Sequence, residues 1–250
     1  MKLHEIIKLE NVSTTYEGEK RPAIKNINLS IKKNEFVYIV GPNAAGKTTL
    51  LETINGLLTP IQGKVQVFGQ DVRKDGAKIR SEIGYVPQDF MVDQNEPYTA
   101  LDVVLMGMYG KIGILKRVED KHKTKALEVM ELLGIKELAN RPVGKLSGGQ
   151  QQKVMIARAL AKEPKILLLD EPFSNLDVES KEKIPKLIYQ LHEERELTTL
   201  VVTHDANQII QNVNRIVIMN EGKIIAEKTG KKLISSLKEF WWLPHTEAVE

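Results

Sequence analysis

The sequence predicts an α/β fold with a mostly parallel central sheet, and three observations support this. The first ninety residues consist mainly of short strand patterns, whereas the chain from about residue 97 is helical. Two later runs, 166–169 and 200–202, are apolar on both faces, as strands in the middle of a parallel sheet are. With 250 residues, the chain can bury a large core without disulfides.

The N-terminal strands fall into two kinds. Segments 27–31 and 65–69 alternate apolar with polar residues, which is typical of half-buried strands, and they predict an N-terminal antiparallel β subdomain. Segment 35–40 is apolar on both faces, which indicates a buried central strand. It leads into a glycine-containing loop, 41–48, and then into a helix that stops near Gly56.

The segment 90–160 is predicted to be a helical subdomain inserted into this core. Its apolar residues recur three and four positions apart in two stripes, which are Leu101, Val104, Leu105 and Met108, and then Ala126, Val129, Met130 and Leu133. The second stripe ends at Gly134, a suitable helix C-cap.

The C-terminal part completes the core. A charge-rich helical stretch separates the two apolar strands, and segments 216–219 and 223–226 predict a hairpin. Residues 231–250 predict a C-terminal helix and tail. The chain is therefore expected to form one domain, with its core in 1–89 and 161–230 and the helical insertion in 90–160.

Composition excludes several classes of function. The 36 basic and 33 acidic residues leave a net charge of +3, which gives no support for nucleic-acid binding. The absence of cysteine excludes disulfides and thiolate metal sites. No apolar run reaches the ~18 residues of a membrane span, and the charged N-terminus does not resemble a secretory signal. A cytoplasmic location is expected, with any membrane attachment provided by another polypeptide.

The loop 41–48 has the pattern of a phosphate cradle. Gly41 and Gly46 allow backbone N–H groups to converge on phosphate oxygens at a helix N-terminus. Lys47 places a positive charge near the β and γ phosphates, and the Thr48 hydroxyl can ligate Mg²⁺. A buried strand before the loop and a helix after it are the context that this interpretation requires.

Two adjacent acids follow the apolar strand 166–169. Ligands of open α/β sheets bind at the carboxyl ends of the strands, and neighbouring strand residues point to opposite faces. Asp170 is expected to hold Mg²⁺ through water, and Glu171 to act on the water attacking the γ-phosphate, as a general base or as an orienting group. Alone, such a pair is most often a helix cap.

The pentapeptide Leu146-Ser147-Gly148-Gly149-Gln150 begins a helix. Ser147 and Gln150 form a capping box, which does not require the two glycines. Glycines at a helix start leave N–H groups open to a phosphate. One chain with two anion sites about a hundred residues apart could use both on one nucleotide only if they belong to different copies.

These motifs together resemble the ATP-binding subunits of ABC transporters, over nearly the whole chain. The loop 41–48 resembles the Walker A motif of a P-loop NTPase core, 166–171 the Walker B motif, and 146–150 the family signature. The resemblance implies a homodimer that encloses ATP and Mg²⁺, with the signature of one copy facing the Lys47 of the other.

The resemblance also implies roles for individual residues. Gln88 matches the Q-loop glutamine, which contacts Mg²⁺ and the attacking water, Asp177 lies in the D-loop, His204 matches the switch histidine, and Tyr16 is placed against adenine. The implied catalytic residues are Lys47, Gln88, Glu171 and His204, and the implied Mg²⁺ ligands are Thr48, Gln88 and Asp170. The implied nucleotide-binding residues are Tyr16, Gly41, Pro42, Asn43, Ala44, Ala45, Gly46, Lys47, Thr48, Thr49, Gln88, Ser147, Gly148, Gly149, Gln150 and Asp177.

Two residues depart from the family pattern. Ala44 replaces the usual glycine of the loop, so this position is expected to take a conformation that a Cβ tolerates. Lys153 replaces the arginine that commonly follows the signature, which keeps the charge but loses the bidentate fork. An active ATPase is expected in spite of both.

The function implied is ATP hydrolysis that powers a membrane permease at the cytoplasmic face, with an extracytoplasmic solute-binding protein as an indirect partner. Segment 103–110 resembles the helical region of importers for zinc, manganese or iron. Chelated iron, cobalamin or another small solute remains an alternative cargo. A soluble ABC ATPase of translation or DNA repair, or a P-loop GTPase or kinase, are the rival classes.

Overall fold

The computed structural model describes residues 5–88, 97–113, 116–173, 176, 178–205, 209–210 and 213–229. The strands of this part are β1 (Glu5–Thr14), β2 (Ile24–Lys32), β3 (Phe36–Val40), β4 (Gln62–Val67), β5 (Gln70–Asp71), β6 (Ile83–Val86), β7 (Ile166–Asp170), β8 (Thr198–Thr203), β9 (Arg215–Asn220) and β10 (Lys223–Thr229). The α-helices are α1 (Lys47–Ile54), α2 (Val72–Ser81), α3 (Ala100–Met106), α4 (Tyr109–Ile112), α5 (Asp120–Leu132), α6 (Gly148–Ala161) and α7 (Val178–Glu194). Two 3₁₀ turns cover Lys136–Leu138 and Val143–Lys145.

The central sheet has six strands in the order β10-β9-β3-β8-β7-β6. The pairs from β9 to β6 are all parallel, and only β10 runs antiparallel to its neighbour. Every residue of β3, β7 and β8 is buried, as expected for strands covered on both faces. The prediction of a mostly parallel sheet is confirmed, as is the antiparallel sheet near the N-terminus, whose order is β2-β1-β4-β5.

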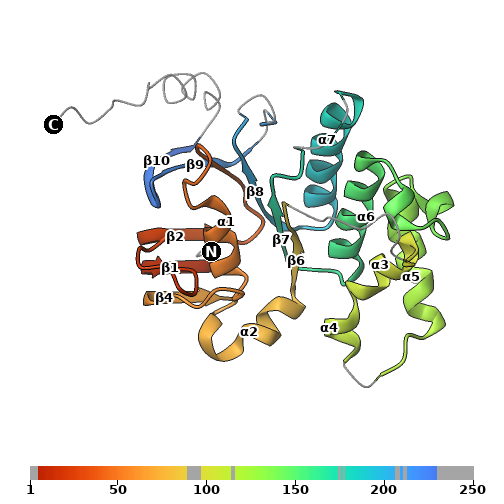
Figure 1. Ribbon diagram of the computed structural model, residues 1–250, viewed down its shortest axis with the longest axis horizontal. Helices are drawn as coiled ribbons and strands as arrows, with labels where there is room; N and C mark the ends of the chain where they lie inside the picture. The colour runs from red at the N-terminus through yellow and green to blue at the C-terminus, as the bar shows by residue number, and fades with distance from the viewer. Residues whose placement is uncertain are drawn as a thin grey trace.

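The alternation of side chains along β3 divides the interior into two cores. Phe36, Tyr38 and Val40 face a core shared with α3, α5, α6 and α7. Val37 and Ile39 face a second core shared with α1, α2 and the antiparallel sheet. Figure 1 shows this arrangement, with the antiparallel strands on one side of the central sheet and α3 to α6 gathered on the other.

The strand register places four chain segments at one edge of the central sheet. Val40 pairs with Thr203, Asp170 with Val202, and Val86 with Leu169. Because these strands are parallel, their carboxyl ends emerge within about one residue of each other in height. The loop after β3, the residues after β8 and β7, and Gln88 after β6 therefore lie along the same edge.

Two sequence-based expectations are corrected by the structure. Residues 72–81, within the region interpreted as mainly strands, form α2, which begins at an Asp71 N-cap. The stripe from Leu101 to Met108 does not lie on one helix, because α3 ends at Met106. At the end of α3, a Cβ on Gly107 would lie 2.0 Å from the Arg158 carbonyl oxygen of α6, so only glycine allows the two backbones to approach this closely.

The other expected elements are present. The hairpin at 216–226 is β9–β10, and α5 ends before Gly134, which has a φ of 64°. The expected C-terminal helix and tail, 231–250, lie outside the described residues. Within the described ranges, no helix has the length and apolar content needed to cross a bilayer.

Candidate functional site

The phosphate-loop candidate joins the central strand β3 to the N-terminus of α1. Gly46 is the N-cap of α1, with a φ of 90°, and its backbone packs against the Ala23 carbonyl oxygen, which a Cβ would approach to 2.7 Å. Only glycine meets both conditions. The first turn of α1 contains no acidic residue, so its free N–H groups face outward without a competing negative charge.

Ala44 lies in the left-handed region, with a φ of 63°. A residue with a Cβ can adopt this region at a cost of about 1 kcal/mol. This agrees with the expectation that Ala44 takes a conformation that a Cβ tolerates. The loop keeps the backbone shape that glycine would adopt, and the surrounding contacts must offset the strain.

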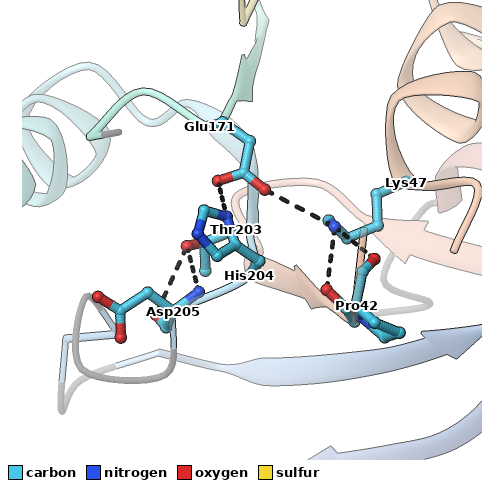
Figure 2. A network of polar contacts seen from close by, with 7 residues as sticks. Pro42, Lys47, Glu171, Thr203, His204 and Asp205 are labelled. Carbon is cyan, nitrogen blue, oxygen red and sulfur yellow. Dashed lines mark hydrogen bonds and ion pairs between the residues drawn. The ribbon is translucent and has the colours of Figure 1, made fainter. Parts of the chain in front are cut away.

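Lys47 is nearly buried and points back into its own loop. Its Nζ donates to the carbonyl oxygens of Gly41 and Pro42, both at 2.9 Å, and lies 3.7 Å from Oε1 of Glu171. Figure 2 shows the ammonium group between these carbonyls and the carboxylate. Burial lowers the pKa of Lys47, and the charges of Glu171 and Asp170 counteract part of that effect.

Glu171 and His204 form a close pair across the ends of β7 and β8. His204 Nδ1 lies 2.7 Å from Oε2 of Glu171, whose side chain is 5% exposed, whereas that of His204 is 47% exposed. Because an ionised carboxylate can only accept, this hydrogen bond places the proton on Nδ1. The network in Figure 2 thus runs from Lys47 through Glu171 to His204.

The turn that carries His204 is held by a residue that the sequence analysis missed. Thr203 Oγ1 accepts from the Asp205 N–H at 3.0 Å, which curls the chain directly after β8. A threonine followed two residues later by a turn position is a weak signal for such a side-chain turn, and it could have been recognised.

Asp170 is the least satisfied polar group of the site. Its side chain is fully buried, and within the described residues neither carboxylate oxygen has a hydrogen-bond partner. Burial raises the pKa of Asp170 to about 6, and the nearby Thr48 hydroxyl offsets part of this rise without satisfying either oxygen. A buried acid without a donor needs a cation or a proton, and oxygen ligands suit a hard divalent cation.

Tyr16 lies against α1. Its hydroxyl is 3.1 Å from Thr49 Oγ1 and donates to Glu52 Oε2 at 3.0 Å, and the side chain is 38% exposed. Glu52 did not stand out in the sequence. Gln88 is exposed at the edge next to β7, and Asp177 lies outside the described residues.

The pentapeptide begins a helix that packs on the other face of the central sheet from α1. Ser147 caps α6 in a complete capping box with Gln150, as predicted. The buried residues of α6 belong to one core and those of α1 to the other, so the two helices cover opposite faces of the central sheet. Ser147 and Gly148 are exposed, and a hollow of about 130 Å³ beside them is lined by Gly149, Lys153 and Ser180 among others.

Comparison with known proteins identifies the family. Residues 24–174 match the family model described as ABC transporter. The chain belongs to the ABC transporter family. This span contains the phosphate loop, the signature pentapeptide and the acid pair Asp170–Glu171, and the chain is an ABC ATPase.

Several ABC relatives cover most of the chain. The manganese transport system ATP-binding protein MntB of Bacillus subtilis is 38% identical over 87% of this chain and 84% of its own length. The zinc transport system ATP-binding protein TroB of Treponema pallidum is 36% identical over 88% and 80%. The sulfate/thiosulfate import ATP-binding protein CysA of Pseudomonas aeruginosa is 39% identical over 87% and 65%.

Solved structures of ABC ATPases have the same fold. A dimeric ATP-binding cassette in a post-hydrolysis state, bound to ADP and Pi, superposes with a TM-score of 0.79 at 37% identity, over 89% of this chain and 98% of that one. A nucleotide-free ATP-binding cassette from an ABC transporter gives a TM-score of 0.83 at 26% identity, over 94% and 96%.

Proposed function

We propose that this chain is the ATPase subunit of a metal-ion importer, acting as a homodimer that closes around two ATP molecules. One observation supports the dimer. The helices α1 and α6, whose N-termini are proposed to bind phosphate, cover opposite faces of one sheet. A nucleotide held at Lys47 would then meet the Ser147 of another copy rather than that of its own chain. The dimeric ADP-bound cassette supports this arrangement.

The proposed catalytic roles follow from the polar network. Lys47 would leave its own carbonyls to neutralise the β and γ phosphates. Glu171 would polarise the attacking water, and His204 would hold the Glu171 carboxylate in position through Nδ1. Thr48, Gln88 and Asp170 would hold Mg²⁺, which when bound supplies charge neutralisation to the phosphates. The unpartnered carboxylate of Asp170 fits that ion.

The remaining assignments belong to the same proposal. Tyr16 would contact adenine, the loop residues 41–49 the phosphates, and Ser147 to Gln150 with Asp177 the partner copy's nucleotide. The domain division is proposed as the core in 1–89 and 161–230, the helical insertion in 90–160, and the C-terminal segment 231–250.

The catalytic proposal is tested by Glu171→Gln. The amide keeps the size of the side chain and cannot act as a base, so ATP should still bind while turnover falls at least about 10²-fold. Size-exclusion chromatography with ATP should then show an accumulated dimer. Turnover equal to that of the unaltered chain would remove Glu171 from the proposed role.

The cargo rests on the relatives. Manganese and zinc transport proteins are among those most similar to this chain, and sulfate and polyamine importers have comparable identity. Within the described residues, no three His, Asp or Glu side chains cluster as metal ligands. We therefore place cargo selection in a membrane permease and in an extracytoplasmic binding protein, with this subunit at the cytoplasmic face.

The cargo is tested in cells that lack this chain. Uptake of radiolabelled Mn²⁺ or Zn²⁺ should fall and should return with the unaltered chain but not with Glu171→Gln. Normal metal uptake together with a loss of sulfate, polyamine or chelated-iron uptake would replace the proposed cargo with that solute.

A further inference from the structure

The turn between β9 and β10 touches the phosphate loop through its backbone. The N–H of Gly222 donates to the Ala45 carbonyl oxygen at 3.1 Å, and the Gly222 carbonyl oxygen accepts from the Lys25 N–H at 2.7 Å. One residue of a hairpin turn thus connects the loop that should bind phosphate with the first residues of β2. None of the motifs in the sequence includes this turn.

The contact leaves no room for a side chain. A Cβ on Gly222 would lie 2.5 Å from the Ala23 carbonyl oxygen, and one on Gly46 would lie 2.7 Å from the same oxygen and 3.4 Å from the Gly222 Cα. The same hairpin meets the start of the loop, where a Cβ on Gly41 would lie 2.2 Å from the Met219 carbonyl oxygen. The hairpin and β2 therefore enclose the loop by direct backbone packing.

The geometry of the peptide bond gives this contact a consequence. In a trans peptide the C=O and N–H groups point in opposite directions. The hydrogen bond from Gly222 directs the Ala45 carbonyl toward the turn, so the N–H of Gly46 points away from the turn and into the loop. This N–H belongs to the N-cap of α1, where an anion is stabilised by the end of the helix.

The same contact holds the strained part of the loop. Ala44 has a φ of 63°, and the carbonyl of the following residue, Ala45, accepts the hydrogen bond from Gly222. If this carbonyl were released, the peptides on either side of Ala45 could rotate, and Ala44 could return to a region that a Cβ prefers. The N–H of Gly46 would then no longer point into the loop.

We propose that Gly222 is a positioning residue for nucleotide binding: through the Ala45 carbonyl it fixes the phosphate loop in its anion-binding shape before the nucleotide arrives. It acts on the loop and touches no substrate. A donor that is already oriented needs no rearrangement on binding, so the loss of the contact should weaken the nucleotide complex more than the fold. The inference rests on the proposed role of loop 41–48.

The first test compares Gly222→Ala with Gly69→Ala. Both glycines have positive φ, at 76° and 72°, so both variants bear the same kind of backbone strain. No atom lies within 4 Å of a Cβ placed on Gly69, whereas one on Gly222 would push the turn off Ala23 and Ala45. In titrations of the full chain with the fluorescent nucleotide MANT-ADP and Mg²⁺, the Kd of Gly222→Ala should be at least about 10-fold above that of Gly69→Ala.

The second test leaves Gly222 intact, so it tests the role of the turn in nucleotide binding even if Gly222→Ala does not fold. Lys25→Pro removes the N–H that binds the Gly222 carbonyl, together with the lysine side chain, in a strand at the edge of its sheet where proline is tolerated. Lys25→Ala keeps that N–H and is its control. The MANT-ADP Kd should rise about 3-fold or more in Lys25→Pro and stay unchanged in Lys25→Ala.

The outcomes separate this inference from the proposed function. Equal Kd values within each pair would overturn the role of the turn while the loop still binds nucleotide. Failure of the unaltered chain and of Gly69→Ala to bind MANT-ADP would overturn the role of the loop itself. Thermal unfolding of each variant supplies the structural readout: Gly222→Ala should unfold at a lower temperature than Gly69→Ala, and the Kd values are compared at a temperature at which both variants are folded.

Discussion

The two helix ends that are proposed to bind anions differ in strain and in the charges around them. The loop before α1 has an exposed tip at 42–44, is strained at Ala44, and lies against the buried side chains of Lys47, Asp170 and Glu171. At the start of α6, Ser147 and Gly148 are exposed, and the capping box satisfies the N–H groups of Ser147 and Gln150. The loop before α1 combines a strained backbone with several charged side chains. The start of α6 is a locally stable helix end, and its proposed function requires a nucleotide bound to another copy of the chain.

The largest difference between the two helix ends is expected in ATPase activity, when the lysine beside each end is replaced. Lys47→Ala removes the charge next to the phosphates and leaves Glu171 without its cation, so ATPase activity should fall on the order of 10³-fold. Lys153→Ala, beside the α6 end, should reduce activity far less. Steady-state ATPase assays compare them, and similar losses would show that the contrast between the ends is incorrect.

A charge at the second end should affect assembly and spare the fold. Ser147→Asp keeps a side-chain acceptor for the Gln150 N–H, and aspartate caps helices as well as serine does. The free energy of unfolding should therefore change by less than about 0.5 kcal/mol. ATPase activity should fall about 10²-fold, because the new carboxylate would face the partner copy's γ-phosphate. Size-exclusion chromatography of the Glu171→Gln chain should show no dimer once Ser147→Asp is added.

The buried carboxylate of Asp170, beside the loop before α1, should lower the stability of the folded chain in a pH-dependent way. Burial raises the pKa of Asp170 to about 6 from its ordinary value near 4, so the folded chain binds this proton more tightly than the unfolded chain. The free energy of unfolding therefore falls as pH rises from about 4 to about 6. Asp170→Asn should stabilise the nucleotide-free chain by up to about 3 kcal/mol at pH 8, and by less at pH 5.

Urea unfolding at the two pH values measures this difference. The same variant should lose the stabilisation that ATP and Mg²⁺ give to the unaltered chain. A destabilised Asp170→Asn at pH 8 would mean that the carboxylate is already satisfied without a cation.

The smallest effect is expected at Ala44. Glycine adopts a φ of 63° without strain, which favours the folded state by about 1 kcal/mol, but it also makes the unfolded chain more flexible. Ala44→Gly should therefore change the free energy of unfolding by less than about 1 kcal/mol and leave the KM for ATP unchanged. A rise in KM would show that the methyl group itself contributes to binding.

Sequence reasoning worked best where one physical requirement acts alone. Strands β3 and β7 could be predicted because burial on both faces requires unbroken apolar runs, and the α6 start because a capping box is local. The cluster of Lys47, Glu171 and His204 could be expected because parallel strands end at one edge.

The missed features depend on backbone contacts between distant segments. Gly107 at the end of α3 lies against the backbone of α6, and Gly222 binds the phosphate loop from 177 residues after Ala45. Residue propensity and hydrophobic periodicity are local properties of the sequence, so they do not predict backbone contacts between distant segments. The hydroxyl contacts of Tyr16 with α1 are equally non-local, which is why Glu52 did not stand out.

The hydrogen bonds of Lys47 to its own loop have a consequence for the proposed catalytic cycle. The carbonyls of Gly41 and Pro42 accept from its ammonium group, so in that cycle the departure of ADP would not leave a bare cation behind. The Lys47 ammonium group would exchange the phosphate oxygens of the nucleotide for the carbonyl oxygens of Gly41 and Pro42. Turnover then avoids the penalty of an unsolvated charge at each exit of product, and the nucleotide must compete with the chain's own oxygens at each entry.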